Sequence, residues 1–591
     1  MRHRRAGLVA AALAALMLAT GCATVPTKGE IRRDSKEGPA AAGGGMVGVK
    51  AQSPRRNMNP QAIVNGFVEA MSDFGGYEVA REYLTPEAAA QWKPETRISV
   101  YDQSSTKAIT PATKNVFRLR APLVGTIDQR GSWSSAPRTS TVSFDFRVTQ
   151  VDGQYRVASV PPGVFLGSNQ LELRLEPFAL YFANRERNML VPDPIFLPRD
   201  LPAGQNATQL IQQLLKGPTS RLGNGAGTAA PPGTQVNVSV PVDNGTATVE
   251  LSDVANGLSE GDRELLAAQI MWTLRPISTR VKITVGGTKL LGDTSPDTLQ
   301  FSNFANFDPA VPVPQMKDLY GVSKGKVQRI PLDGSGPIGP SPLDDSALSL
   351  YTAESFAVNL RGSDGAIVTT VDGKPSVAVA PLETLDEDDK VDPVRTEGEV
   401  LRPSFDNQDN LWIVDRARSS APRLRVRAKD GKVSDVRVNF LGNTPLSLRM
   451  APDGVRALMV MRDKAGKNFV QTGTVNSNDA KQLQLGQFRK LELSLTDITD
   501  ATWSQLGVLV AGKPRPDAAR ELWFVNTDGS QPRLVPGVAN NFEAKTLASN
   551  SNLDTLPAVK DTDGRMHWQQ KDLSWQTLED PPVVVDPVYP G

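Results

Sequence analysis

Cysteine and histidine are almost absent from this chain of 591 residues, which has one cysteine and two histidines. The single cysteine, Cys22, has no partner within the chain, so internal disulfides do not stabilise the fold. His3 and His567 are too few to supply a zinc site, which needs several His or Cys ligands together. No Gly-x-Ser-x-Gly nucleophile motif accompanies His567, so a structural histidine is favoured over a catalytic base.

Long hydrophobic runs are also scarce, and the one that occurs lies at the N-terminus. Arg2, Arg4 and Arg5 precede an uncharged segment, Ala6 to Thr20. That segment is too short to cross a bilayer comfortably but is typical of the core of a secretory signal. No second run of about 18 apolar residues follows it. We therefore expect residues 1–21 to be a signal peptide and the mature chain to lie outside the cytoplasm.

Neither sign of charge is in excess. The chain has 65 Lys and Arg against 64 Asp and Glu. Loss of residues 1–21 removes three Arg and no acid, which leaves 62 basic and 64 acidic side chains and a net charge of −2. Domains that bind nucleic acid usually carry a basic patch or excess. The charge balance thus gives no reason to expect a nucleic acid partner.

Motifs for nucleotides and metals are missing as well. The sequence GNGAGT at 223–228 lacks the G-x-G-x-x-G spacing and is followed by two prolines, and GPAAAGGG at 38–45 has no flanking helix or strand pattern. The acidic stretch LDEDDKVD at 385–392 lacks the spaced ligands of a calcium loop. We interpret these stretches as a loop, a spacer and a solvated loop, and we expect no cofactor and no metal. The many acids give no basis for choosing a carboxylate pair for glycoside hydrolysis.

The apolar run ends in Ala19-Thr20-Gly21-Cys22, which resembles the bacterial lipobox although Ala19 stands where a larger aliphatic residue is preferred. The resemblance implies cleavage between Gly21 and Cys22, followed by S-diacylglycerol and N-acyl modification of Cys22 with palmitate-type chains. Two or more acyl chains hold a protein stably at a membrane. Residues 22–57, polar and rich in Gly and Ala, are expected to form a flexible tether.

Residues 58–198 show a mixed helix and strand pattern typical of an α+β domain. Helical spacing is evident for Ile63, Phe67, Ala70 and Phe74. Strict alternation from 142 to 148, a turn at Asp152-Gly153 and further alternation to 157 predict a hairpin. A further half-buried strand is predicted from the alternation of three leucines at 171, 173 and 175.

Residues 199–300 predict a second α+β domain. Two stretches have helical periodicity, 207–215 and 266–274. Three stretches alternate as strands do, 236–242, 247–251 and 281–285, and Asp-Asn-Gly at 243–245 supplies a turn between the first two.

Residues 310–585 repeat loosely, with turn residues followed by alternating strands about every 45 to 55 residues. This period favours a β-propeller of about five or six blades, with a pair of β-sandwiches as the alternative. Trp412 and Trp523 lie within alternating strands and are expected in the core. For Trp568 and Trp575 the sequence leaves two roles open: packing in the core, or contact with a sugar or a protein partner.

The segments LIQQLLKGP, PPGTQVNVSVPVDNGTATVELS, LLAAQIMWTL and VKITVGG are similar to the GerMN module of exported bacterial proteins. Together with the lipobox, the N-terminal domain and the β-rich tail, they resemble the LpqB lipoproteins of actinobacteria over essentially the whole chain. The resemblance implies a non-enzymatic accessory protein, anchored at the extracytoplasmic face of the cell membrane. It also implies a partner, the extracellular part of a two-component sensor histidine kinase that acts in envelope and cell-division signalling. The alternative is a lipoprotein that binds or hydrolyses cell-wall carbohydrate.

Overall fold

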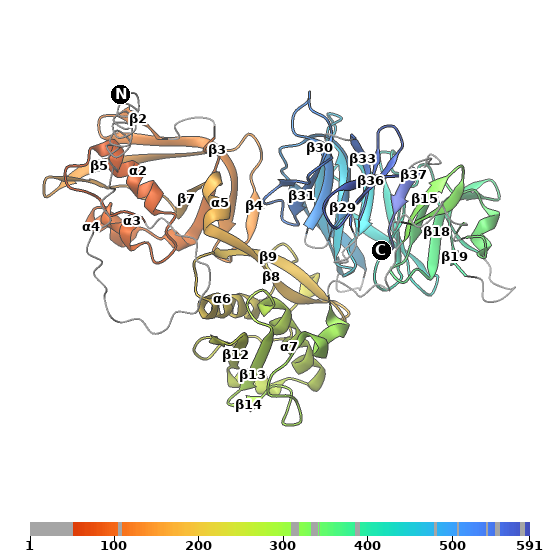
Figure 1. Ribbon diagram of the computed structural model, residues 1–591, viewed down its shortest axis with the longest axis horizontal. Helices are drawn as coiled ribbons and strands as arrows, with labels where there is room; N and C mark the ends of the chain where they lie inside the picture. Colours follow the sequence, from red (N-terminus) through yellow and green to blue (C-terminus); the bar gives the residue numbers. More distant parts are fainter. Residues whose placement is uncertain are drawn as a thin grey trace, which may run out of the picture. The chain divides into compact units, whose positions relative to one another are not determined.

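The computed structural model places two mixed α/β regions ahead of a region built from strands (Figure 1). Cys22, the predicted leader, most of the tether and nearly all of the acidic stretch 385–392 lie outside the described residues. The described residues are 51–104, 109–308, 318–331, 341, 343–383, 391–477, 482–504, 507–538, 542–549, 556–578 and 585–591.

The first region is a mostly antiparallel sheet against which short helices pack. Its strands follow the order β6-β5-β3-β1-β7, with β2 and β4 also paired to β3. The helices are α2 (Pro60–Ala70), α3 (Glu78–Glu82), α4 (Pro86–Gln91) and α5 (Ser168–Arg174). The strands are β1 (Arg97–Tyr101), β2 (Ile109–Thr113), β3 (Val116–Asp128), β4 (Trp133–Ser135), β5 (Thr141–Val151), β6 (Gln154–Val157) and β7 (Val164–Gly167).

Helix α2 confirms the first predicted helix. Its N-cap is Asn59, whose Oδ1 accepts a hydrogen bond of 2.8 Å from the backbone N–H of Ala62. Phe67 points into the core, with ring centroids 5.3 Å from Trp92 and 6.1 Å from Phe146. The helix ends at Ala70, so the half-buried Phe74 lies beyond it rather than on its apolar face.

The hairpin β5–β6 is also confirmed, because Asp152 and Gly153 both have positive φ, 50° and 73°, as a type I′ turn requires. The strand predicted at 171–175 is wrong: residues up to Arg174 form helix α5. Leu171 and Leu175 are buried whereas Leu173 is 53% exposed. Two residues four apart share a face in a helix too, so the pattern fitted both structures.

The second region has its core between a hairpin, two helices and a small sheet. Strands β12 and β13 run parallel and α7 connects them, while β11 and β14 pair antiparallel at the edges. The β8–β9 hairpin shares this core. The elements are β8 (Leu175–Asn184), β9 (Leu190–Pro198), α6 (Ala203–Leu215), β10 (Ala226–Gly227), β11 (Val242–Asp243), β12 (Thr246–Leu251), η2 (Asp253–Gly257), α7 (Glu260–Leu274), β13 (Arg280–Val285), β14 (Thr288–Lys289) and η3 (Phe301–Phe307).

Most predicted elements of this region are confirmed by α6, α7, β12 and β13, but the strand 236–242 is not. Only Val242 and Asp243 are strand residues, and Val236 forms an isolated bridge with Leu251. Val238 is 85% exposed while Val240 is buried. The valines alternate and the segment lies beside β12, with backbone bonds from the Asn237 N–H to the Glu250 carbonyl and from the Thr248 N–H to the Pro241 carbonyl. Between Val236 and Val242 these contacts form no regular ladder.

The third region is a β-propeller, which confirms the predicted architecture and excludes the sandwich pair. In the described residues its strands form five sheets. Four are single blades: β16-β15-β37, β17 to β20, β29 to β32 and β33 to β36. The fifth has eight strands, because the blades β21 to β24 and β25 to β28 are joined by the parallel pairing of β24 with β28. Strand β37 (Val585–Val588) pairs with β15 (Asp318–Ser323), so the last strand completes the blade that begins the region. The other blade strands are β16 (Lys326–Pro331), β17 (Ser355–Val358), β18 (Asp364–Val371), β19 (Lys374–Pro381), β20 (Asp392–Arg395), β21 (Ser404–Phe405), β22 (Leu411–Asp415), β23 (Arg423–Arg427), β24 (Val433–Val438), β25 (Thr444–Met450), β26 (Arg456–Arg462), β27 (Asn468–Ser477), β28 (Leu483–Leu491), β29 (Thr496–Trp503), β30 (Gly507–Lys513), β31 (Glu521–Asn526), β32 (Arg533–Leu534), β33 (Ala544–Ala548), β34 (Ala558–Asp561), β35 (Met566–Gln569) and β36 (Trp575–Thr577).

Candidate functional sites: the propeller axis and a groove on the second domain

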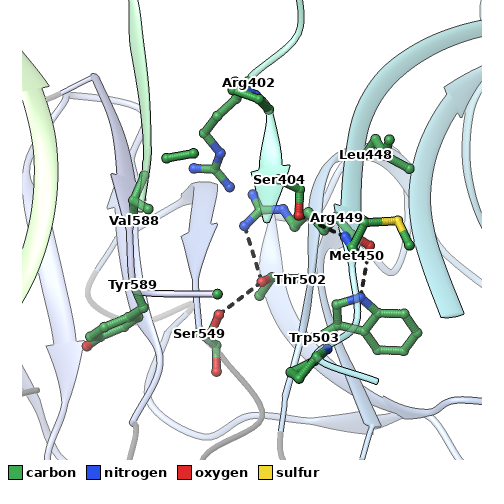
Figure 2. Close-up of a pocket in the computed structure, with 14 residues that line it drawn as sticks. Arg402, Ser404, Leu448, Arg449, Met450, Thr502, Trp503, Ser549, Val588 and Tyr589 are labelled. Carbon is green, nitrogen blue, oxygen red and sulfur yellow. Dashed lines mark hydrogen bonds between the residues drawn. The ribbon is translucent and has the colours of Figure 1, made fainter. Parts of the chain in front are cut away.

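A pocket lies where the first strands of the blades converge in the propeller (Figure 2). Its volume is about 40 Å³, far below the roughly 300 to 1,000 Å³ of a typical small-molecule site. Its size suits a few water molecules rather than a sugar ring. The residues that line it are Ala357, Arg402, Pro403, Ser404, Leu448, Arg449, Met450, Pro452, Thr502, Trp503, Ser549, Val588, Tyr589 and Gly591.

The charged and polar groups of this axial pocket bond mainly to one another. The guanidinium of Arg449 donates to both carboxylate oxygens of Asp500 at 3.0 and 2.8 Å, and to Thr502 Oγ1 at 3.2 Å. Trp503 Nε1 donates to the Arg449 carbonyl at 2.9 Å, and an Arg402 nitrogen donates to the Pro587 carbonyl at 3.0 Å. These bonds connect neighbouring blades. The polar groups around the pocket therefore stabilise the contact between the blades.

His567 lies on β35 and is buried inside its blade. One ring nitrogen, Nε2, is 2.8 Å from Asp561 Oδ2, and the other, Nδ1, is 2.9 Å from Thr577 Oγ1. Its ring stacks on Phe542 with centroids 3.8 Å apart and an angle of 7° between the planes. Both nitrogens and one face of the ring therefore contact side chains of the propeller, the kind of environment expected for a structural histidine.

Replacing His567 by alanine should lower the free energy of unfolding by about 1–3 kcal/mol, because the buried Asp561 carboxylate loses the imidazole as a partner. Chemical denaturation of the full chain measures this change. Thr577→Val is the matched control: it removes the bond at the other nitrogen from an exposed residue and should cost less than about 1 kcal/mol. Equal losses for the two variants would contradict the role given to the Asp561 bond.

Most tryptophans of the propeller are buried or half-buried rather than exposed on its surface. Trp412 is buried, and its Nε1 donates to Asp406 Oδ2 at 3.0 Å. Burial raises the pKa of that Asp406 carboxyl, although the hydrogen bonds from its neighbours oppose the shift. Trp523 is half-buried against a core cluster, which agrees with its predicted place in the core.

The two tryptophans left open by the sequence also take part in packing. Trp568 is buried, and Trp575 is half-buried with its Nε1 donating to the Pro536 carbonyl at 2.9 Å. The ring of Trp575 meets the edge of Phe542 at 5.2 Å. Trp568 is too buried to stack on a sugar ring, and Trp575 is held by its contacts with Phe542 and the Pro536 carbonyl.

The glycine-rich loop at 223–228 contacts the propeller. A Cβ on Gly225 would lie 2.8 Å from Val455 Cγ1 and 3.0 Å from the Val475 carbonyl, so the backbone approaches β27 too closely for any side chain. Thr474 Oγ1 donates to the Arg221 carbonyl at 3.1 Å in the same contact. The predicted loop is confirmed only for 223–225, because Ala226 and Gly227 form the short strand β10 beside β8. Gly225 permits the close packing against the propeller. Among the described residues no group of three His, Cys, Asp or Glu side chains is arranged to hold a metal.

A larger groove lies on the second domain, between the start of α7 and the segment 291–304. Its volume is about 540 Å³, within the usual range for a ligand or peptide site. Leu299 and Phe304 are buried beneath it. This groove could not be predicted from the sequence, because its lining residues are some thirty positions apart and share no motif. The lining residues are Leu258, Glu260, Arg263, Glu264, Leu291, Pro296, Leu299, Asn303 and Phe304.

The fold defines a class of protein in which two α+β domains precede a β-propeller. Family models match these regions in the same order: the N-terminal domain of lipoprotein LpqB at 53–172, a sporulation and spore germination module at 179–291, and the lipoprotein LpqB beta-propeller domain at 339–590. The chain belongs to the LpqB lipoprotein family, and the GerMN-like module predicted from the sequence is confirmed.

Curated relatives support the same assignment along the whole chain. Lipoprotein LpqB of Cutibacterium acnes is 28% identical over 97% of each chain. Lipoprotein LpqB of Streptomyces coelicolor is 28% identical and covers 100% of this chain and 98% of its own. Among solved structures, TolB from Acinetobacter baumannii is 11% identical with a TM-score of 0.35, covering 59% of this chain and 87% of that one. No helix within the described ranges is both long and apolar enough to cross a membrane.

Proposed function

We propose that this protein is a lipid-anchored accessory protein that binds the extracellular part of a two-component sensor histidine kinase and modulates it in envelope and cell-division signalling. The observation that supports this most directly is membership of a membrane-lipoprotein family across the full length of the chain. In this proposal residues 1–21 are the leader, Cys22 carries the lipid and residues 22–57 are the tether. The folded domains then remain within a tether's length of the outer face of the membrane.

The proposal is for a binding protein rather than an enzyme. The axial pocket is small, and His567 has both nitrogens bonded within its own blade. The axial pocket and His567 do not support carbohydrate binding or hydrolysis, which is the alternative function. Saturable binding to purified peptidoglycan or arabinogalactan, without any kinase association, would replace our proposal with that one.

Co-purification tests the partner directly. The full-length tagged chain is solubilised from its own membranes in mild detergent, and we expect a sensor kinase to co-purify above the amount seen with an unrelated tagged lipoprotein. In vesicles that contain both proteins, we expect the rate of kinase autophosphorylation to change at least twofold relative to vesicles without this chain. Absence of the kinase from the purified material, together with an unchanged rate, would contradict the proposal.

A further inference from the structure

The groove of the second domain has an apolar base and an acidic rim. Leu299 and Phe304 are buried beneath it, and the half-buried Leu258 and Leu291 line its sides. Such a surface favours an apolar side chain from another molecule, because burial of apolar area on both partners stabilises the contact.

Two carboxylates give the rim its charge. Glu260 and Glu264 are exposed and one helical turn apart on α7, so both lie along the same side of the groove. Neither has an ion-pair partner in the described part of the chain. The neighbouring Arg263 points its guanidinium at the carbonyls of Leu258 and Asn256, 3.1 and 2.9 Å away, and pairs with neither glutamate. Its charge offsets one of the two carboxylates, so the lining keeps one net negative charge. The acidic side of the groove is therefore available to a cation.

We propose that this groove is the docking site for a peptide segment of the partner protein, one that inserts an apolar side chain and places a Lys or Arg beside Glu260 and Glu264. This inference rests on the proposed function and identifies the surface that performs it. The volume of about 540 Å³ accommodates one or two large side chains. The acidic rim repels anionic lipid headgroups and favours a basic segment.

Charge reversal tests the groove. The full-length chain is prepared as wild type, as Glu260→Lys/Glu264→Lys, and as the control Glu354→Lys/Glu383→Lys, which makes the same charge change at exposed acids of the propeller. Binding to the purified extracellular domain of the kinase is measured by titration. We expect the groove variant to bind at least tenfold more weakly and the control to bind within about twofold of wild type.

A second variant separates shape from charge. Pro296→Trp adds bulk at an exposed position on the groove without altering its charge, and it should also weaken binding at least tenfold. An unfolding midpoint equal to that of wild type shows that each variant is folded. Wild-type affinity in both groove variants, or an equal loss in the control, would overturn the groove as the docking site while leaving the kinase as partner.

If the wild-type chain does not bind the kinase domain, the proposed function is contradicted. Photo-crosslinking then tests whether the groove binds a peptide of another protein. A photoreactive phenylalanine replaces Gly261, an exposed residue beside Glu260 where a side chain would meet no other atom within 4 Å, in the full-length chain within its own membranes, and the attached peptide is sequenced. A peptide from another exported protein, with an apolar residue within two positions of a Lys or Arg, supports the groove with a different partner. No adduct, a lipid adduct or a peptide from a second copy of this chain overturns it.

Discussion

Replacing Cys22 by serine should abolish lipid labelling of the protein completely. The thiolate of cysteine is a far stronger nucleophile than a hydroxyl and is the group to which diacylglycerol becomes attached. Each buried acyl methylene contributes about 0.8 kcal/mol, so two chains provide stable anchoring where one does not. Cells grown with a palmitate analogue should show label on wild type and none on the variant. The variant should also accumulate as the uncleaved precursor, since cleavage before residue 22 follows lipid attachment.

Two further chains make this result specific. Thr24→Ser changes a neighbouring residue and keeps the thiol, so it should be labelled and processed as wild type. A chain that has an ordinary export leader in place of residues 1–22 should be released into the medium, because it lacks the proposed lipid anchor. Label on the serine variant, or retention of the cysteine-free chain by cells, would show that Cys22 is not the anchor.

Periodicity in the sequence was most informative where an element is long. In α7, Leu266, Ile270 and Leu274 follow at intervals of four and are all buried. Over these nine residues the helical and strand periods diverge, which leaves one interpretation. In β12, alternate residues from Ala247 to Leu251 are buried as well, and this shorter pattern holds because β13 pairs with the strand along its whole length.

Short patterns failed for the same physical reason. The leucines at 171, 173 and 175 span five residues, and within that length burial at i and i+4 fits a helix as well as a strand. The valines at 236–242 alternate over seven residues and lie beside β12, yet the pairing is regular only from Val242 onward. Local sequence contains no information about the partner strand.

The functional surfaces were less predictable than the fold. The lipidation proposed at Cys22 rests on a local sequence motif, which can be recognised without the tertiary structure. The groove and the axial pocket, by contrast, exist only because distant segments meet: α7 with residues 291–304, and the first strands of several blades with one another. The buried ion pairs that stabilise the blades were unpredictable for the same reason, because they too join residues distant in sequence or on different strands. One charged residue in a strand looks the same in sequence whether solvent or another charge faces it.

Replacing Asp415 by alanine should lower the free energy of unfolding by about 3–5 kcal/mol, because it removes the main counter-charge of two largely buried guanidinium groups and leaves Arg423 with only a 3.5 Å contact to the exposed Glu397. The Asp415 side chain is 0% exposed. Arg423 donates to its two oxygens at 3.0 and 2.7 Å, and Arg425 donates to one of them at 2.7 Å. The hydrogen bond to Asp415 raises the pKa of Arg423, whereas burial lowers the pKa of Arg425. Denaturant unfolding of the full chain measures the loss.

Asp517→Ala is the matched control, because it also removes an aspartate paired with an arginine. Its pair with Arg515 spans 3.6 Å, and the two side chains are 82% and 75% exposed. An exposed pair of this kind contributes about 0–1 kcal/mol. A loss at Asp415 no larger than the loss at Asp517 would contradict the assignment of the Asp415 cluster as a buried, mutually compensated site.

A triple variant identifies the origin of the loss. If the cost of Asp415→Ala comes from uncompensated charge, then Asp415→Leu/Arg423→Met/Arg425→Met should recover most of it, since apolar residues of similar volume often replace a buried ion cluster at little cost. If it comes instead from lost hydrogen bonds to the backbone, such as the 3.3 Å bond from the Glu397 N–H to Asp415, the triple variant should remain as unstable as the single one. Recovery would show that the carboxylate stabilises this blade by neutralising the two arginines on β23.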